Sequence, residues 1–111
     1  YGKLFEQLVI CECFRLRDYF EKEFQFSYLR SRDGAEIDLI VKKPRNKKIL
    51  IEIKSSNKIV PADYRHLISL GKDIDHVEKW IICTEKSPRQ TEDGVRILPW
   101  KDALKELFSI S

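Results

Sequence analysis

Apolar and polar residues follow two different periods along the chain, and each period predicts a type of element. From Leu4 to Lys22 apolar side chains recur at steps of three and four residues, without Gly or Pro, which predicts a long helix. From Phe24 to Arg30 they alternate at every second residue, which predicts a strand. Two further runs, Glu36 to Lys42 and Lys48 to Lys54, are rich in β-branched residues and predict two more strands.

The connections between these three strands are short. Asp33-Gly34 is a tight-turn dipeptide, and Lys43 to Lys47 is a second polar turn. Neither leaves room for the crossover that parallel neighbours need. The three strands are therefore predicted to form an antiparallel meander.

The second half of the chain predicts a helix, two strands and a last helix. The first helix runs from Pro61 to Gly71, and the compact apolar run Val77 to Thr84 suits a strand buried on both faces and parallel to the third strand. A polar loop is expected from Glu85 to Asp93, then a short strand from Gly94 to Leu98, and Pro99 opens the final helix. The predicted order, αβββαββα, describes an α/β fold with a mixed sheet flanked by helices.

Three ionisable side chains interrupt the predicted apolar strands. Asp38 shares a face of its strand with Glu36 and Ile40, and Glu52 shares a face with Lys54. The opposite faces are aliphatic and can pack a core, with Ile37, Leu39 and Val41 on one strand and Ile49, Ile51 and Ile53 on the other. A charge taken out of water costs several kcal/mol unless it is paired or bound to a metal, so these positions are candidates for function.

Hairpin pairing would bring Asp38, Glu52 and Lys54 together, because opposite side chains on one face lie about 5 Å apart at Cβ. Two carboxylates at that separation repel each other, and a divalent cation with oxygen ligands relieves the repulsion.

Length and composition restrict the class of protein. The 111 residues suffice for one domain, 42% are hydrophobic and 35% charged, and the net charge of +3 argues only weakly for a nucleic-acid partner. No apolar run approaches the roughly 20 residues of a membrane span, and no signal peptide is visible. The three cysteines lack metal-ligand spacing and are expected to be reduced thiols in the cytoplasm. Because the chain begins with Tyr1, we expect residues 1–111 to be a single domain excised from a longer protein.

The order of elements and the charged positions together resemble the PD-(D/E)XK nuclease superfamily, which has a restriction endonuclease-like core. Its motif is an acid in the second strand followed by Glu or Asp, any residue and Lys in the third, which Asp38 and Glu52-Ile53-Lys54 match. Many members add a glutamate on the first helix, where this chain has Glu6. On sequence alone Glu6 could equally be a favourable acid in the first turn of the helix.

A closer resemblance is to the nuclease-like C-terminal domain of unknown function carried by many prokaryotic AAA-type ATPases. It rests on Gly2 to Val9, Tyr28 to Arg30, Gly34 to Asp38, Ile51 to Lys54 and Ile97 to Trp100. This resemblance implies an ATPase module as a partner in the same protein, and the chain has no phosphate-binding glycine loop of its own. A Holliday junction resolvase-like endonuclease shares the acids and the Glu-X-Lys and is an alternative.

The superfamily resemblance implies a hydrolase that cuts nucleic acid with Mg²⁺ or Mn²⁺. Asp38 and Glu52 would hold the metal together with the backbone carbonyl of Ile53, and Glu6 would assist through water or at a second ion. Lys54 would position the attacking water or offset charge in the transition state. The alternative is a catalytically inactive module that binds DNA or a protein, because fold does not imply function.

Several basic or hydroxyl side chains are candidates for contacts to the phosphates of nucleic acid, with DNA favoured over RNA. They are Arg30, Arg32, Lys42, Lys43, Arg45 and Ser55. For the lysine-rich turn, a solvated loop is the favoured interpretation. A homodimer is a further possibility, since related nucleases often dimerise.

Overall fold

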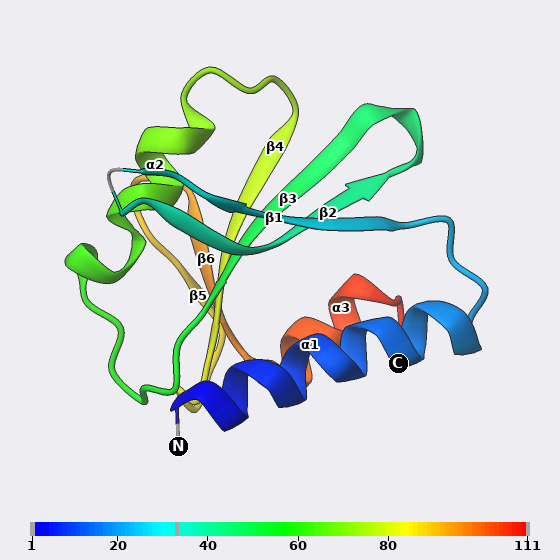
Figure 1. The fold of residues 1–111 in the computed structure, drawn as a ribbon. Helices are drawn as coiled ribbons and strands as arrows, with labels where there is room; N and C mark the ends of the chain where they lie inside the picture. The colour runs from blue at the N-terminus through cyan, green and yellow to red at the C-terminus, as the bar shows by residue number, and fades with distance from the viewer. Residues whose placement is uncertain (1, 33, 111) are drawn as a thin grey trace.

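Six strands form one mixed sheet in the computed structural model, which describes residues 2–32 and 34–110 (Figure 1). The order across the sheet is β1-β2-β3-β4-β6-β5. The strands are β1 (Gln25–Arg30), β2 (Glu36–Lys43), β3 (Lys47–Ile53), β4 (Val77–Cys83), β5 (Arg89–Gln90) and β6 (Val95–Pro99). The α-helices are α1 (Gly2–Tyr19), α2 (Arg65–Gly71) and α3 (Trp100–Leu107), and short 3-10 turns occupy Pro44–Asn46 and Pro61–Tyr64.

The pairing of the strands follows from the connections between them. β1, β2 and β3 pair antiparallel, which confirms the predicted meander. β4 lies parallel to β3 because a helical segment intervenes, as predicted, and β6 lies parallel to β4. The predicted α/β class with a mixed sheet flanked by helices is confirmed.

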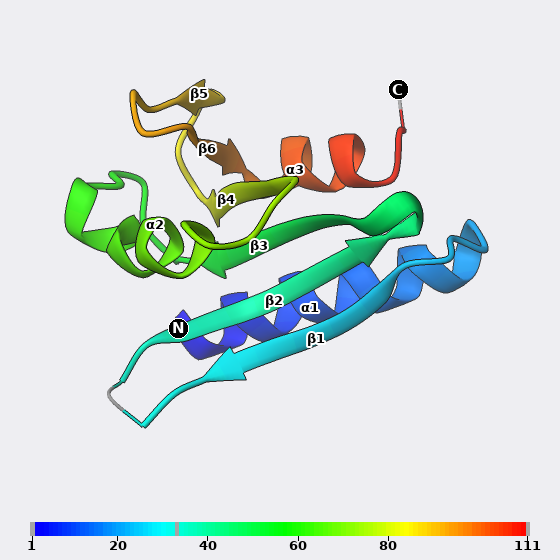
Figure 2. The ribbon, with the colours of Figure 1, turned by 90° about the horizontal axis from the view of Figure 1, so that it is seen from above.

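The helices cover both faces of the sheet. Figures 1 and 2 show α1 and α3 along one face and α2 on the other. Two apolar clusters result, one under α1 and α3 that includes Ile51 and Trp80, and one under α2 that includes Leu50 and Ile81. Neighbours along one strand thus enter opposite cores, which confirms that β4 is buried on both faces.

Helix α1 ends at Tyr19, three residues before the predicted end at Lys22. Glu21 takes a left-handed conformation with φ of 52°, and the Lys22 N–H donates to the Arg17 carbonyl at 2.9 Å. This 6→1 hydrogen bond is the Schellman ending of a helix, a position that usually carries Gly. Because Glu21 occupies it here, the sequence carries no stop signal, and the longer prediction was wrong.

Two other local predictions differ from the structure. The expected polar loop from Glu85 to Asp93 contains β5, which pairs antiparallel with β6. A two-residue edge strand with exposed side chains has no alternation to detect. The helix expected from Pro61 opens instead as a 3-10 turn, in which the Val60 N–H donates to the Asp63 carboxylate at 2.9 Å.

A β-bulge in β2 changes the predicted alternation of side chains. Leu29 pairs with Ile37 and Ser27 with Ile40, so Asp38 and Leu39 together lie opposite Tyr28. Ile37 consequently joins the core under α2 with Ile40, whereas Leu39 lies in the core under α1. The prediction that Ile37 and Leu39 share a face was wrong, because a strict period of two does not survive an extra residue.

The remaining local features concern the turn before β2, the helices and the cysteines. Asp33 of the predicted turn lies outside the described residues, while Gly34 has φ of +88°, a conformation that favours glycine. No helix among the described residues is both long and apolar enough to cross a membrane. Cys11 is exposed and Cys13 and Cys83 are buried, and none of the three is in a disulfide.

Ile51 provides a test of this packing, since it is fully buried between β2 and β4. Ile51→Ala should lower the free energy of unfolding by about 2–5 kcal/mol and Ile51→Val by about 0.5–1.5 kcal/mol, because each leaves a cavity. Urea denaturation with an unchanged m-value measures both. Tyr19→Ala, at a side chain 73% exposed, should stay within about 0.5 kcal/mol, and equal losses at the two positions would contradict this core.

Candidate functional site

An open cleft with a volume of about 470 Å³ lies where β2 and β3 separate and the first turns of α1 approach them. Most of the residues that line it are polar or charged. They are Gly2, Lys3, Glu6, Arg30, Gly34, Glu36, Asp38, Glu52, Ile53, Lys54, Ser55 and His66. We call this space the acidic cleft.

Asp38 lies in the β-bulge of β2 at the mouth of this separation. Leu39 still pairs with Ile51 of β3, but the Ile53 N–H donates to the Asp38 carboxylate at 2.8 Å. A side chain thus replaces the backbone partner that a continued ladder would supply. Bulges commonly re-aim a side chain beside active sites, and here the bulge and the hydrogen bond fix the Asp38 carboxylate.

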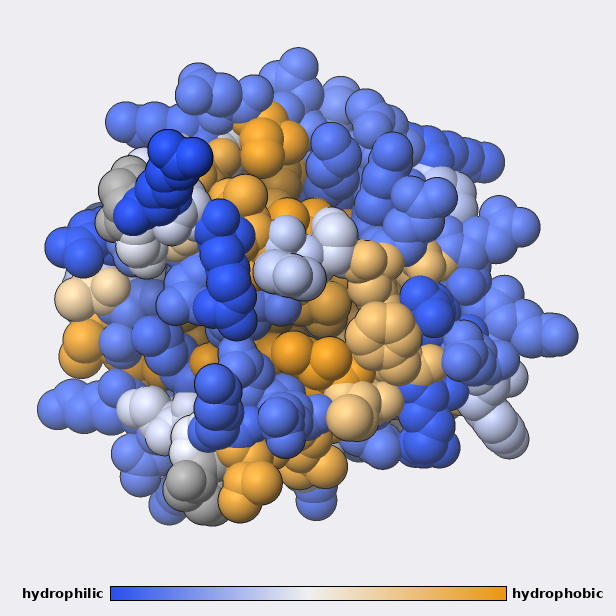
Figure 3. Space-filling view, in the orientation of Figure 1, coloured by the Kyte–Doolittle hydropathy of each residue, from blue (hydrophilic) through white to orange (hydrophobic). Residues whose placement is uncertain are grey.

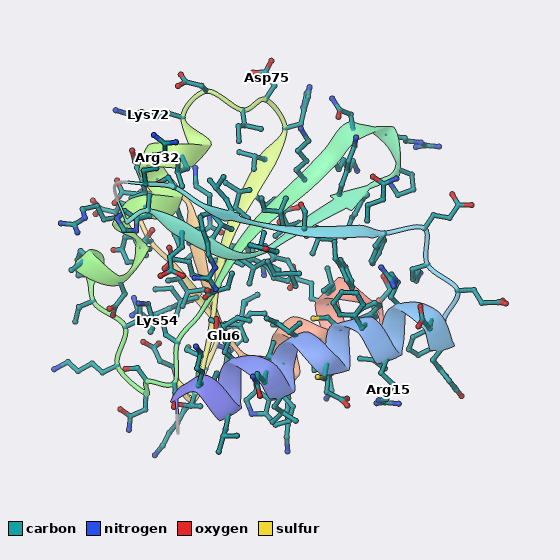
Figure 4. All side chains as sticks on the ribbon, in the orientation of Figure 1. Glu6, Arg15, Arg32, Lys54, Lys72 and Asp75 are labelled. Carbon is teal, nitrogen blue, oxygen red and sulfur yellow. The ribbon has the colours of Figure 1, made fainter. Side chains whose placement is uncertain are left out.

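The surroundings of Asp38 favour its neutral form. Burial raises its pKa to about 6, the hydrogen bond from the Ile53 N–H opposes the rise, and a hydrogen bond shared with Glu6 adds to it. Figure 4 shows Glu6 on the side of α1 that faces the sheet. The glutamate predicted on the first helix therefore meets the strand acid directly.

Glu52 is the one charged residue among those described that is almost fully buried, with 6% of its surface exposed. It pairs in register with Ile81 of β4 near the end of β3. Burial raises its pKa to about 7, the nearby charge of Lys54 lowers it, and the charge of Asp38 raises it. Asp38 is therefore close enough for its charge to disfavour the ionisation of Glu52.

Lys54 follows the last residue of β3, and its N–H donates to the Ile82 carbonyl at 2.9 Å. Figure 4 shows it beside Glu6 at this end of the sheet. Within the described part of the chain, no ion pair joins Lys54 to Asp38 or Glu52. The ammonium group of Lys54 and the carboxylates of Asp38 and Glu52 therefore line the same cleft without forming an ion pair with one another.

The loop after Lys54 is held in place by two side chains from beyond β4. The Glu85 carboxylate accepts from the Ile59 N–H at 2.7 Å, and Arg89 donates to the Ile59 carbonyl at 3.0 Å. Glu85 and Arg89 also pair with each other at 2.9 Å. The Thr84 N–H donates to the Ser56 carbonyl at 3.0 Å. We call Glu85 and Arg89 the loop clamp.

The structure brings together most of the site residues predicted from the sequence. Those that line the acidic cleft are Glu6, Arg30, Asp38, Glu52, Ile53, Lys54 and Ser55. Arg32 does not line it and lies apart from Glu6 and Lys54 in Figure 4. Lys42, Lys43 and Arg45 line a separate depression near the turn between β2 and β3. Lys42 is four residues along β2 from Asp38, about 13 Å, so the basic turn is no part of the cleft.

Three charged or titratable residues of the cleft were not predicted as site residues. Lys3 precedes Glu6 by three residues and so shares its helical face. His66 is on α2, which follows β3, and a helix after a strand starts near that strand's end. Glu36 has a half-exposed side chain and pairs with Arg30 at 2.5 Å in the cleft.

The oxygen atoms of the cleft suit a small divalent cation. Within residues 2–32 and 34–110, no group of three or more His, Cys, Asp or Glu side chains is arranged to hold a metal ion. The cleft instead offers the pair Asp38 and Glu52, whose raised pKa values report repulsion and burial that a cation would offset. Two carboxylates and the Ile53 carbonyl fit Mg²⁺, which keeps several waters and binds few protein ligands.

The raised pKa values predict a pH dependence of stability in the metal-free protein. Above pH 4 the unfolded carboxyl groups ionise first, so the folded state loses stability until pH passes about 6 for Asp38 and about 7 for Glu52. Glu52→Gln should therefore gain stability relative to wild type as pH rises from 4.5 to 7, by up to about 3 kcal/mol. Urea denaturation at several pH values with EDTA measures this difference, and the exposed control Glu92→Gln should show none. A constant difference for Glu52→Gln across that range would refute the burial of an ionisable carboxyl.

Comparison with known proteins identifies the family of the chain. No curated protein and no solved structure was found to match it. One family model, described as Domain of unknown function (DUF4143), matches residues 1–103. The chain therefore belongs to the DUF4143 family of domains of unknown function.

Proposed function

We propose that this domain is a metal-dependent nuclease that hydrolyses phosphodiester bonds of nucleic acid. The observation that carries the proposal is the convergence of a buried carboxylate, Glu52, a half-buried one, Asp38, and Lys54 on a single open cleft, with the pKa values of both carboxyl groups raised. Clusters of perturbed carboxylates in a cleft are typical of functional sites. The resemblance of Asp38 and Glu52-Ile53-Lys54 to the PD-(D/E)XK motif supports the same reaction.

Each side chain at the centre of the cleft has a role in this proposal. Asp38 and Glu52 would hold Mg²⁺ or Mn²⁺, with the Ile53 carbonyl beside them. A bound divalent cation would polarise the phosphodiester and lower the pKa of a water molecule. Among the described residues, Lys54 forms no ion pair with Asp38 or Glu52. Its ammonium group would therefore be available to stabilise the charge that develops on the phosphate. Glu6 would accept a proton or hold water at Asp38, with which it shares a hydrogen bond.

Positive and hydroxyl groups around the carboxylates would bind the phosphates that flank the cut. Arg30, Lys3 and Ser55 line the cleft, and Arg30 remains exposed although it pairs with Glu36. A guanidinium matches two phosphate oxygens at once. An association with an ATPase module, a homodimer, and a preference for DNA stay predictions from the sequence.

Metal binding is testable by thermal unfolding. Mn²⁺ at about a hundredfold above its Kd should stabilise the wild type by about 2.7 kcal/mol, because it binds only the folded site. Glu52→Gln and Asp38→Asn should lose this shift in melting temperature, since each removes a ligand. The control Asp102→Asn, at an exposed acid on α3, should keep it. An equal shift in all four proteins would mean that the ion binds elsewhere.

Cleavage is testable with labelled single-stranded, duplex and branched DNA and RNA in the presence of Mg²⁺ or Mn²⁺. We expect the wild type and Asp102→Asn to cut at least one substrate. Asp38→Asn, Glu52→Gln and Lys54→Ala should lower the rate about 100-fold or more, because each removes a group that acts on the reacting phosphate. If the wild type leaves every substrate intact but still binds nucleic acid, the domain is a binding module and the nuclease proposal fails.

A further inference from the structure

A second cavity, apolar in character, opens between α1 and the β1–β2 hairpin. Its volume is about 440 Å³, within the roughly 300–1,000 Å³ of ligand pockets. The residues that line it are Ile10, Phe14, Phe26, Ser27, Tyr28, Asp38 and Leu39. Figure 3 shows apolar side chains exposed in the middle of this face, over the space between β1 and α1, with polar side chains around them. We call this cavity the aromatic groove.

The aromatic groove and the acidic cleft share one residue, Asp38. The bulge in β2 places Asp38 beside Leu39, whose side chain packs on the α1 side, while Ile37 packs on the α2 side. One carboxylate thus borders both spaces. A ligand with a phosphate in the cleft would have its next chemical group at the entrance of the groove.

The aromatic rings of the groove differ in what they leave exposed. Phe14 and Phe26 pack edge to face, with ring centroids 4.9 Å apart. Tyr28 lies two residues after Phe26 on the same face of β1, and 68% of it is exposed. Tyr28 therefore offers a flat, largely uncovered surface next to a wall formed by the other two rings.

Two arginines flank these rings. The Arg17 guanidinium lies 4.8 Å from the ring centres of both Phe14 and Phe26, and that of Arg30 lies 5.8 Å from the ring of Tyr28. Aromatic side chains interleaved with cations are the pattern that binds single-stranded nucleic acid, since bases stack on the rings and phosphates contact the cations. A purely apolar partner would gain nothing from the arginines or from the carboxylate at the groove's end.

We propose that the aromatic groove binds an unpaired nucleobase next to the scissile phosphate, with the base stacked on Tyr28. This inference rests on the proposed nuclease function and narrows its substrate to single strands, or to junctions and ends with unpaired nucleotides. In a duplex, the bases are stacked on one another and cannot enter the groove without being extruded.

The test compares a fluorescein-labelled single-stranded DNA 12-mer with a 12-mer that has three central abasic residues, which keep the phosphates but lack bases. Binding is followed by fluorescence anisotropy with Ca²⁺ present and the integrity of the strand checked. The wild type should bind the abasic strand, and the matching duplex, about tenfold more weakly than the 12-mer, because base stacking is lost. Tyr28→Ala should bind both single strands equally, and Tyr28→Trp should restore the difference.

A control variant separates stacking on Tyr28 from a general loss of exposed aromatic surface. Tyr28 is so exposed that its replacement should leave the fold intact, and Tyr19→Ala, which removes an equally exposed ring outside the groove, should bind as the wild type does. Equal wild-type affinity for the normal and abasic strands would overturn the proposal. The proposal would also be overturned if Tyr28→Ala changed only the self-association of the protein and not its binding of DNA, because the groove would then be a protein interface.

The two proposals fail in different ways. Cleavage that depends on Asp38 but ignores the abasic substitution would leave the nuclease function standing and remove the stacking site. Base-dependent binding that requires Tyr28, without cleavage of any substrate, would leave the stacking site standing and remove the nuclease function.

Discussion

The hydrogen bond from the Ile53 N–H to the Asp38 carboxylate is the contact on which the site depends. It forms where the ladder between β2 and β3 stops, so a side chain satisfies a backbone donor that would otherwise be buried without a partner. The bulge at Asp38 and Leu39 makes this geometry available. The bulge therefore accounts at once for the separation of the strands, the position of the carboxylate and the opening of the acidic cleft.

The two cores hold this opening in a fixed shape. Ile51 and Ile53 of β3 pack under α1, while Leu50 packs under α2, so both helices are anchored to the strand that carries Glu52. Such a strand can carry a buried carboxyl because its neighbours supply apolar contacts on both faces. The raised pKa values of Asp38 and Glu52 show that the site works against the stability of the fold. Strained or repulsive groups persist where the surrounding packing fixes them, and they cluster at functional sites.

Most of the fold could be predicted from the sequence because it is encoded in local periods. The long helix, the meander and the Val77 to Thr84 strand all carry strong patterns, and their order was correct. The bulge could not be predicted, since Ile37 to Val41 reads as an ordinary alternation and only pairing with β1 reveals the extra residue. The same holds for the end of α1 at Glu21, where a glutamate occupies a position typical of glycine.

Charges in apolar strands predicted the carboxylates and the lysine at the centre of the candidate site. The residues at its edges were not predicted, because they come from elements that are distant along the chain. Lys3 and His66 line the acidic cleft from two helices. Arg32, on the β1–β2 hairpin, does not line it. The basic turn does not line the cleft, because the turn and the cleft lie at opposite ends of β2. A one-dimensional pattern identifies which strand carries the acids, but not which side chains close around them.

The loop clamp joins the segment after β4 to the loop after β3, and this contact constrains how the two clamp residues can change in evolution. Glu85 and Arg89 are held by each other and by both backbone groups of Ile59, in the loop that follows Lys54. Loss of one of the two residues would leave the charge of the other without its partner, whereas loss of both would not. Within the family these two positions should therefore change together, and they should do so although neither borders the acidic cleft.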